Sequence, residues 1–211
     1  MTSLMRINYF ISILAGSIFF DCSHSKPLPP NLVFEDQIWM SKNLDVDKFQ
    51  NGDLIIESKT KEDWVRACEN HKPTWSNFEN EKANGRKYGK LYNWYVITDP
   101  RGISPKGWHI PNSVEWIKLI DFMGGMEKGG KRMRKKEFKN RNEIQFGFCA
   151  EAGGYRDTTG NFVGLGYYRN WWVLDTNSTE APIISMSPDK NSIFMNSVPT
   201  GMGIAIRCIK D

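Results

Sequence analysis

Gly107 to Trp116 reads Gly-Trp-His-Ile-Pro-Asn-Ser-Val-Glu-Trp, and it marks the start of the best-defined helix in the chain. Asn112 is a favourable N-cap residue, and Glu115 stands where its carboxylate can close a capping box onto the Asn112 backbone N–H. Apolar residues then recur at i, i+3, i+4 and i+7, the spacing of one helix face. These residues are Trp116, Leu119, Ile120 and Met123. Gly124 ends the pattern, so we expect a helix whose apolar stripe belongs to the core.

Towards the N-terminus, the sequence predicts two short strands and a second helix. Residues 37–40 and 53–57 have the composition of short strands, and a turn signal separates them. Thr60 with Asp63 begins a capping-box pattern that leads into a short helix. Residues 70–87 are polar and rich in turn-forming residues, so we expect a long surface loop there.

The C-terminal half alternates short apolar segments with turn residues, and residues 157–160 read as a hairpin-like loop. The predicted short strands are 145–150, 154–156, 161–163, 170–174, 183–186, 193–196 and 204–209. Few helices, many short strands and long loops indicate a single α+β domain. A length of 211 residues with 40% hydrophobic residues is sufficient to build one core.

The charge of the chain is nearly balanced, with a formal net charge of +4. The positive excess is concentrated in residues 128–139, where lysines and arginines crowd together. We interpret this run as a solvated loop or helix face, and a patch for acidic polymers is the alternative. Neither a nucleic-acid-binding motif nor interleaved aromatic residues accompany the run, so we expect no nucleic-acid partner.

The N-terminus has the layout of a secretory signal. A positive residue precedes the apolar stretch 7–20, which is short for a membrane span of about 20 residues. Cys22 follows as in the lipobox of bacterial lipoproteins, although Asp21 is a poor residue before the cleavage point. We expect a lipoprotein-type signal peptide over 1–22, a lipid on Cys22 that anchors the exported protein at the outer membrane or cell surface, and a proline-rich tether over 23–33. A plain signal peptide and an uncleaved anchor are the alternatives.

If Cys22 carries lipid, three cysteines remain, which permits one disulfide and one free thiol in an oxidising compartment. We predict that Cys68 pairs with Cys208. Cys149 lies in an apolar phrase and is expected to be a buried structural thiol. The spacings match no short zinc pattern, and the chain has three histidines, so we expect no metal bound by sulfur.

Several landmarks occur in a fixed order along the chain. Tyr88 to Tyr95 reads Tyr-Gly-Lys-Leu-Tyr-Asn-Trp-Tyr and precedes the Gly107–Trp116 stretch. The other landmarks are residues 37–44, Trp64, Cys68, residues 99–102, 105–111, 153–157, 171–172, 178–180 and 207–211. Together they resemble the Fibrobacter succinogenes major paralogous domain, a family of exported bacterial modules. The resemblance places this domain at residues 34–211.

That family is similar to the C-type lectin-like superfamily, in which a Leu-Pro-x-x-x-Glu-Trp helix start and a terminal Arg-Cys strand recur. The resemblance implies a C-type lectin-like α+β fold, with few short helices, short antiparallel strands and long loops, on the cell surface. It implies no established activity. The chain departs from the family pattern at Ser76, where many members carry Cys, and at Cys149, where a small polar residue is usual.

Residues that carry catalytic or metal chemistry are sparse. His109 is interpreted as a hydrogen-bonded structural group, with catalysis as the alternative. The sequence contains no nucleophile-elbow, zinc-protease or phosphate-loop motif. Oxygen atoms suited to calcium occur on Asp157, Asn161, Asp175, Asn177 and Glu180, but turn and cap roles explain these residues equally well. We therefore predict no cofactor and no metal site.

Trp171 and Trp172 pose a more open question. Adjacent strand residues face opposite sides, so one ring is expected to enter the core and the other to point away. An outward ring can stack on a sugar or on a protein partner. The alternative is that loops cover both rings. With Tyr167 and Tyr168 nearby, these four residues are the predicted ligand-binding aromatics.

Function hypotheses of different classes follow. We expect a non-catalytic surface module that binds a glycan or a protein partner through lectin-like loops. The alternative is an enzyme related to the formylglycine-generating (sulfatase-modifying) fold, which requires a reactive cysteine, and Cys149 and Cys208 are placed late enough for that role. A structural surface protein without a single ligand is the third reading.

Overall fold

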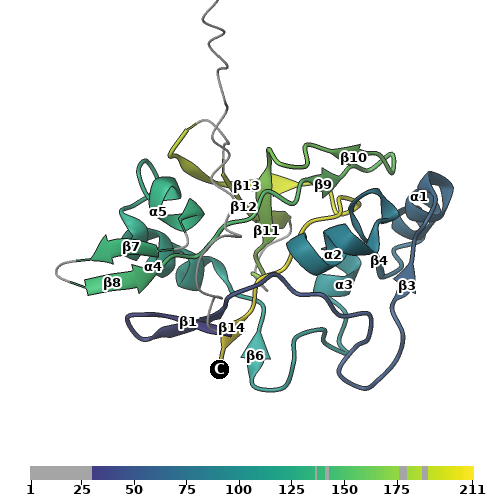
Figure 1. Cartoon of the computed structure of the whole chain (residues 1–211). Coiled ribbons are helices and arrows are strands. Elements are labelled where there is room, and N and C mark those ends of the chain that lie inside the picture. Colours follow the sequence, from purple (N-terminus) through teal and green to yellow (C-terminus); the bar gives the residue numbers. More distant parts are fainter. Residues whose placement is uncertain (1–29, 136, 141–142, 176–179, 187–189) are drawn as a thin grey trace, which may run out of the picture.

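The computed structural model describes residues 30–135, 137–140, 143–175, 180–186 and 190–211, and Figure 1 shows how their elements are arranged. The helices of this part are α1 (Lys61–Glu69), η1 (a 3₁₀ turn, Phe78–Asn80), α2 (Lys82–Tyr88), α3 (Trp94–Ile97), α4 (Ser113–Met123) and α5 (Gly130–Arg134). The strands are β1 (Asn31–Phe34), β2 (Gln37–Met40), β3 (Ile56–Glu57), β4 (Thr74–Ser76), β5 (Leu91–Tyr92), β6 (Trp108–His109), β7 (Glu137–Asn140), β8 (Glu143–Phe146), β9 (Tyr155–Arg156), β10 (Phe162–Val163), β11 (Arg169–Trp172), β12 (Ala181–Met186), β13 (Ile193–Val198) and β14 (Ile209–Lys210).

The strands form several small sheets. The sheet β1-β2-β14-β6 joins both ends of the described chain, because Ile209 in β14 pairs antiparallel with Trp39 in β2 and with His109 in β6. The sheet β11-β12-β13 is also antiparallel, whereas β3-β4-β5 contains one parallel pair. The hairpins β9–β10 and β7–β8 complete the set. This mixture of short helices and small, mainly antiparallel sheets confirms the predicted α+β class.

Strand β11 lies between two clusters of buried apolar side chains. Trp171 belongs to the first cluster, where its ring centroid lies 5.7 Å from that of Trp116 and 5.5 Å from that of Phe148. Trp172 belongs to the second cluster, 5.3 Å from the ring of Trp94. Because successive strand residues face opposite sides, these two adjacent tryptophans link both halves of the core.

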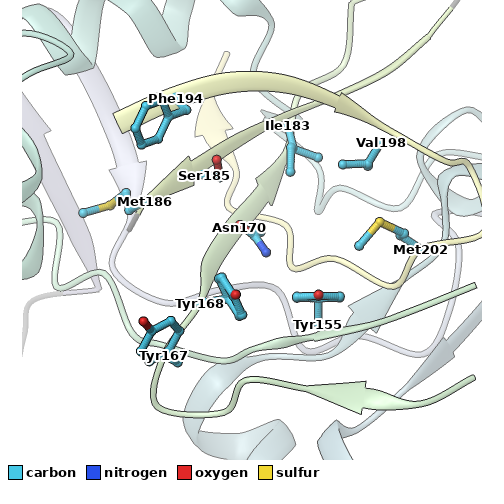
Figure 2. Close-up of a pocket in the computed structure, with 10 residues that line it drawn as sticks. All are labelled: Tyr155, Tyr167, Tyr168, Asn170, Ile183, Ser185, Met186, Phe194, Val198 and Met202. Carbon is cyan, nitrogen blue, oxygen red and sulfur yellow. The ribbon is translucent and has the colours of Figure 1, made fainter. Parts of the chain in front are cut away.

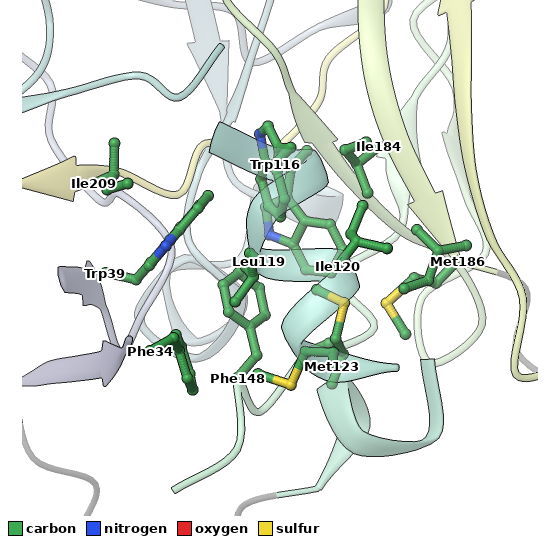
Figure 3. Close-up of a cluster of buried hydrophobic side chains, with 14 of the residues drawn as sticks. Phe34, Trp39, Trp116, Leu119, Ile120, Met123, Phe148, Ile184, Met186 and Ile209 are labelled. Carbon is green, nitrogen blue, oxygen red and sulfur yellow. The ribbon is translucent and has the colours of Figure 1, made fainter. Parts of the chain in front are cut away.

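Helix α4 forms as the sequence predicts. Asn112 Oδ1 accepts a hydrogen bond from the Glu115 backbone N–H at 3.0 Å, and Glu115 Oε2 accepts one from the Asn112 N–H at 2.9 Å, which makes a complete capping box. The apolar stripe from Trp116 to Met123 is buried in the first cluster (Figure 3). Each such side chain contributes about 1.5–3 kcal/mol on burial. Gly124, with a φ of 112°, caps the helix in the left-handed conformation.

Helix α1 also begins where the sequence predicts. The side chain of Thr60 accepts a hydrogen bond from the Asp63 backbone N–H at 3.0 Å. Trp64, the first large apolar residue after the cap, is fully buried, and its indole N–H donates to the carbonyl of Gly201 at 2.9 Å. The helix is therefore attached to a segment 137 residues further along the chain.

The expectation of a surface loop over residues 70–87 is wrong. The segment contains β4, η1 and α2, and the residues of β4 are buried because this strand lies between β3 and β5. One of the two buried hydroxyls of β4 has a partner that compensates for burial, since the hydroxyl of Thr74 lies 2.7 Å from that of Ser58. The hydroxyl of Ser76 is buried without a hydrogen-bond partner among the described residues. The polar composition of the segment concealed a central strand.

Two boundaries also differ from the prediction. Strand β1 begins at Asn31 and pairs with β2, so residues 31–33 of the predicted tether belong to the sheet. The strand expected over residues 53–57 is reduced to Ile56–Glu57, because Leu54 forms an isolated bridge with Lys48 instead.

The predicted signal peptide, its Cys22, and tether residues 23–29 lie outside the described residues, as does Asn177. Among the helices within the described ranges, none is long and apolar enough to cross a membrane.

Candidate binding cleft

A cleft of about 430 Å³ opens beside the β11-β12-β13 sheet (Figure 2). One wall is the sheet face that carries Ile183 and Ser185 from β12 and Phe194 and Val198 from β13. The opposite wall consists of Tyr155, Tyr167, Tyr168 and Met202. We call this feature the tyrosine cleft.

The tyrosines of the wall contact one another in a row. The ring of Tyr168 lies 5.4 Å from that of Tyr155 and 5.0 Å from that of Tyr167, both in edge-to-face geometry. Tyr167 and Tyr168 remain 49% and 37% exposed. Their position depends on Gly164, whose φ is 68° and where an added Cβ would lie 2.2 Å from the Tyr168 ring.

Asn170 forms the floor of the cleft (Figure 2). Its side chain is on the same sheet face as its cross-strand partner Ser185, while the next residue, Trp171, faces the opposite side. Asn170 is 8% exposed, and within the part of the chain that the structure describes its side-chain amide has no hydrogen-bond partner. The amide atoms of Asn170 are not among the fully buried polar atoms that lack a partner, so they still meet solvent through the open cleft. The amide is therefore available to a ligand in the cleft.

The tyrosine cleft carries no formal charge among the described residues that line it. Its polar atoms are the Asn170 amide, the Ser185 hydroxyl and the three tyrosine hydroxyls. The Ser185 hydroxyl already accepts a hydrogen bond from Asn196 at 3.0 Å. Burial raises the pKa of Tyr155, and the neighbouring Tyr168 and Asp157 add to this effect, so its hydroxyl stays protonated. The cleft suits an uncharged ligand that is largely apolar.

The four predicted aromatics separate into two groups. Trp171 and Trp172 are fully buried, so the prediction that one of them offers an exposed ring is wrong and the buried alternative is confirmed. The Trp171 indole N–H donates to Asn43 at 2.9 Å, and that of Trp172 to the carbonyl of Tyr92 at 2.7 Å. Tyr167 and Tyr168, by contrast, line the cleft.

Sequence reasoning missed most of the other cleft residues. The position of Asn170 could have been predicted from the sequence. It lies one position before the tryptophan pair, so on a strand its side chain faces the side opposite to Trp171. The positions of Tyr155, Phe194 and Met202 could not, because segments far apart in the sequence bring them to the cleft.

His109 lies between two carboxylates. Its Nδ1 is 2.8 Å from Asp211 Oδ1, and its Nε2 is 2.8 Å from Glu115 Oε1. Burial lowers the pKa of His109, but the hydrogen bonds to Asp211 and Glu115 outweigh burial and raise the pKa above its ordinary value. His109 therefore ties the C-terminus to the start of α4.

The predicted disulfide between Cys68 and Cys208 is not formed, because both cysteines are free thiols in different surroundings. Cys68 Sγ lies 3.5 Å from the carbonyl of Gly201, whereas Cys208 Sγ lies 3.8 Å from the hydroxyl of Ser104. Burial raises the pKa of Cys68 and raises that of Cys208 to about 12. Such thiols are poor nucleophiles. Cys149 is buried, as expected, but it is disulfide-bonded, so the prediction that it is a thiol is wrong.

Asp157 and Asn161, two of the oxygen-bearing residues considered for calcium, have a structural role. Asp157 Oδ1 accepts hydrogen bonds from the backbone N–H groups of Thr159 and Asn161, both at 2.9 Å, which stabilises the β9–β10 turn. Across the described ranges, no three side chains of His, Cys, Asp or Glu gather as a metal-binding group would require.

Comparison with curated proteins and with solved structures finds no match. The family model of the Fibrobacter succinogenes major domain matches residues 34–210, which is most of the chain and almost all of the described fold. The protein therefore belongs to the Fibrobacter succinogenes major domain family.

Proposed function

We propose that this protein is a non-catalytic module of the cell surface that binds a protein partner through the tyrosine cleft. The observation that carries the proposal is the composition of the cleft: aromatic and aliphatic walls on both sides, no charged side chain among the described lining residues, and one largely buried asparagine at its floor whose amide makes no hydrogen bond to a described residue. Exposed tyrosines with such surroundings are typical of protein recognition sites.

A glycan fits the same cleft less well. A sugar ring carries several hydroxyl groups, and each one that is buried without a hydrogen bond costs about 1–3 kcal/mol. Ile183, Met186, Phe194, Val198 and Met202 offer no hydrogen bond apart from their backbone groups. An apolar side chain of a protein gives up no hydrogen bonds when it packs against these residues. The protein partner is therefore the stronger candidate.

The proposal also includes the location and the finer fold. Export, with a lipid on Cys22 as the anchor, rests on the signal-like sequence of residues 1–22. A C-type lectin-like fold is supported by the way in which the helix start at Glu115 and the terminal Asp211 converge on His109. The absence of catalysis is supported by the buried, high-pKa thiol of Cys208.

Two parallel screens of the full chain test this function. A library of random 12-residue peptides on phage and a glycan array are each probed with the wild-type protein and with Tyr168→Ala. We expect enriched peptides whose affinity falls at least tenfold in Tyr168→Ala. The matched control is Ile117→Ala, which removes an exposed apolar side chain from α4 and should bind normally. Saturable binding to one glycan class without any peptide binding would reverse the choice of partner.

A further inference from the structure

Strand β13 is the edge strand of the β11-β12-β13 sheet. Its sequence, Ile-Phe-Met-Asn-Ser-Val, contains no charged residue and no proline, two residue types with which proteins usually protect such an edge. Phe194 and Met195 are 45% and 36% exposed, and Asn196 and Ser197 are exposed as well. An open edge of this composition is suited to pairing with another strand.

The hydrogen-bonding pattern shows which backbone groups of β13 point outward. The Pro182 carbonyl accepts from the Val173 N–H at 3.0 Å, so the backbone groups of Pro182 face β11 and those of the next residue, Ile183, face β13. Asn196 is the partner of Ile183 and therefore faces β12. By alternation, the N–H and C=O groups of Met195 and Ser197 point away from the sheet.

Ile193 corroborates this alternation. It has the same parity as Met195 and Ser197, and its N–H donates outward, to the carbonyl of Met126 at 2.6 Å. Among the described residues, no comparable partner meets the backbone groups of Met195 or Ser197. The edge is therefore closed at its Ile193 end and open over residues 195–197.

The open edge adjoins the tyrosine cleft. Phe194 and Val198 line the cleft from the same strand (Figure 2), and their side chains lie on the sheet face of Ser185 and Ala181. A strand added beside β13 would place every second side chain on that face, about 5 Å from Phe194 or Val198. Backbone pairing and side-chain recognition would thus act on one ligand.

We propose that the partner presents an extended, uncharged segment that adds to β13 as a fourth strand and directs alternate apolar side chains to the tyrosine cleft. This inference rests on the proposed function and specifies its ligand. The outward N–H and C=O groups of Met195 and Ser197 have the spacing with which another extended backbone forms hydrogen bonds. Since Met126 restricts the open run to three residues, a slender segment fits it better than the edge of a second copy of this chain.

The test compares Met195→Pro with Met195→Ala in binding to the peptides enriched from the phage library. Proline removes the outward N–H of residue 195 and leaves the ladder to β12 intact, whereas alanine keeps both backbone groups. We expect at least a tenfold loss of affinity in Met195→Pro and less than a threefold loss in Met195→Ala. Ser197→Pro repeats the test at the other open position, and circular dichroism verifies the fold of each variant.

The outcomes separate the two proposals. Equal binding by wild type and both proline variants, combined with a loss in Tyr168→Ala, would overturn the strand addition but leave the cleft as the binding site. Equal losses in Met195→Pro and Met195→Ala would also overturn it, because the side chain rather than the backbone would then make the contact. A concentration-dependent dimer in sedimentation, abolished by Met195→Pro, would assign the edge to a second copy and refute a foreign segment.

Discussion

The indole N–H of Trp171 donates a hydrogen bond to Asn43 Oδ1 at 2.9 Å, across 128 positions of sequence. The same oxygen accepts from Arg207 Nε at 2.8 Å, and the Asn43 amide nitrogen donates to the carbonyl of Tyr88 at 2.7 Å. One asparagine side chain therefore joins the loop after β2, strand β11 and the C-terminal segment.

We expect Asn43→Ala to destabilise the protein by about 2–6 kcal/mol, since buried donors on Trp171 and Arg207 lose a shared acceptor at about 1–3 kcal/mol each. Urea denaturation followed by tryptophan fluorescence measures the change. Asn31→Ala, at an exposed position of β1, is the control and should shift the midpoint little. A change below 0.5 kcal/mol in Asn43→Ala would show that Asn43 is dispensable, on the scale of ordinary surface substitutions of about ±0.5 kcal/mol.

Arg156 provides a second prediction. Its guanidinium lies between the rings of Trp64 and Phe162, 4.6 Å from each centroid, and donates to the carbonyls of Ser58, Thr60 and Gly160. Burial lowers its pKa to about 10. A lysine has the charge but neither the planar stacking surface nor the fork of donors, so Arg156→Lys should destabilise by about 2–4 kcal/mol.

The control for Arg156→Lys is Arg66→Lys on the exposed side of α1. Thermal unfolding at neutral pH compares both variants with wild type. If the two variants unfold at the same temperature, the sandwich between Trp64 and Phe162 contributes no specific stability.

The sequence predicted those parts of the fold that depend on local chemistry. The cap at Asn112 and the stripe that follows it specify α4 without any distant contact, and Thr60 does the same for α1. Strand β4 was not predicted because it is buried by β3 and β5, which lie on either side of it. In addition, the strand has only three residues, which is too short to show an alternating pattern of apolar and polar residues.

The cleft was predicted only in part, for a related reason. Tyr167 and Tyr168 are adjacent residues that were predicted as ligand-binding aromatics, and both line the cleft. Trp171 and Trp172 were expected to differ in exposure, but each side of β11 has its own apolar cluster, so neither ring reaches solvent. The position of Met202 opposite β12 depends on the path of the whole chain.

His109 should make stability depend on pH. Its pKa is raised in the folded protein by Asp211 and Glu115, so its contribution is fully present below the unfolded pKa of about 6.5 and is lost as the pH rises through the folded value. We expect His109→Gln to be more destabilising at pH 5.5 than at pH 8.5. Because the side chain is partly exposed, the difference should stay below about 1 kcal/mol.

Urea midpoints of wild type and His109→Gln at the two pH values measure this effect. His71→Gln serves as the control, because His71 is exposed and makes no ion pair with a described carboxylate. A larger cost of His109→Gln at pH 8.5 than at pH 5.5 would contradict the assigned sign.

The thiol of Cys208 gives a prediction that bears directly on catalysis. The side chain is fully buried and its pKa is raised to about 12, so almost no thiolate exists at pH 8. We expect iodoacetamide to leave Cys208 unmodified in the native protein and to alkylate it in 8 M urea, as measured by mass spectrometry of peptides. Cys68, which is half-buried, is the internal comparison and should react faster than Cys208. Rapid alkylation of native Cys208 would place a reactive thiol in reach of substrates, and the enzymatic alternative would then displace the binding module.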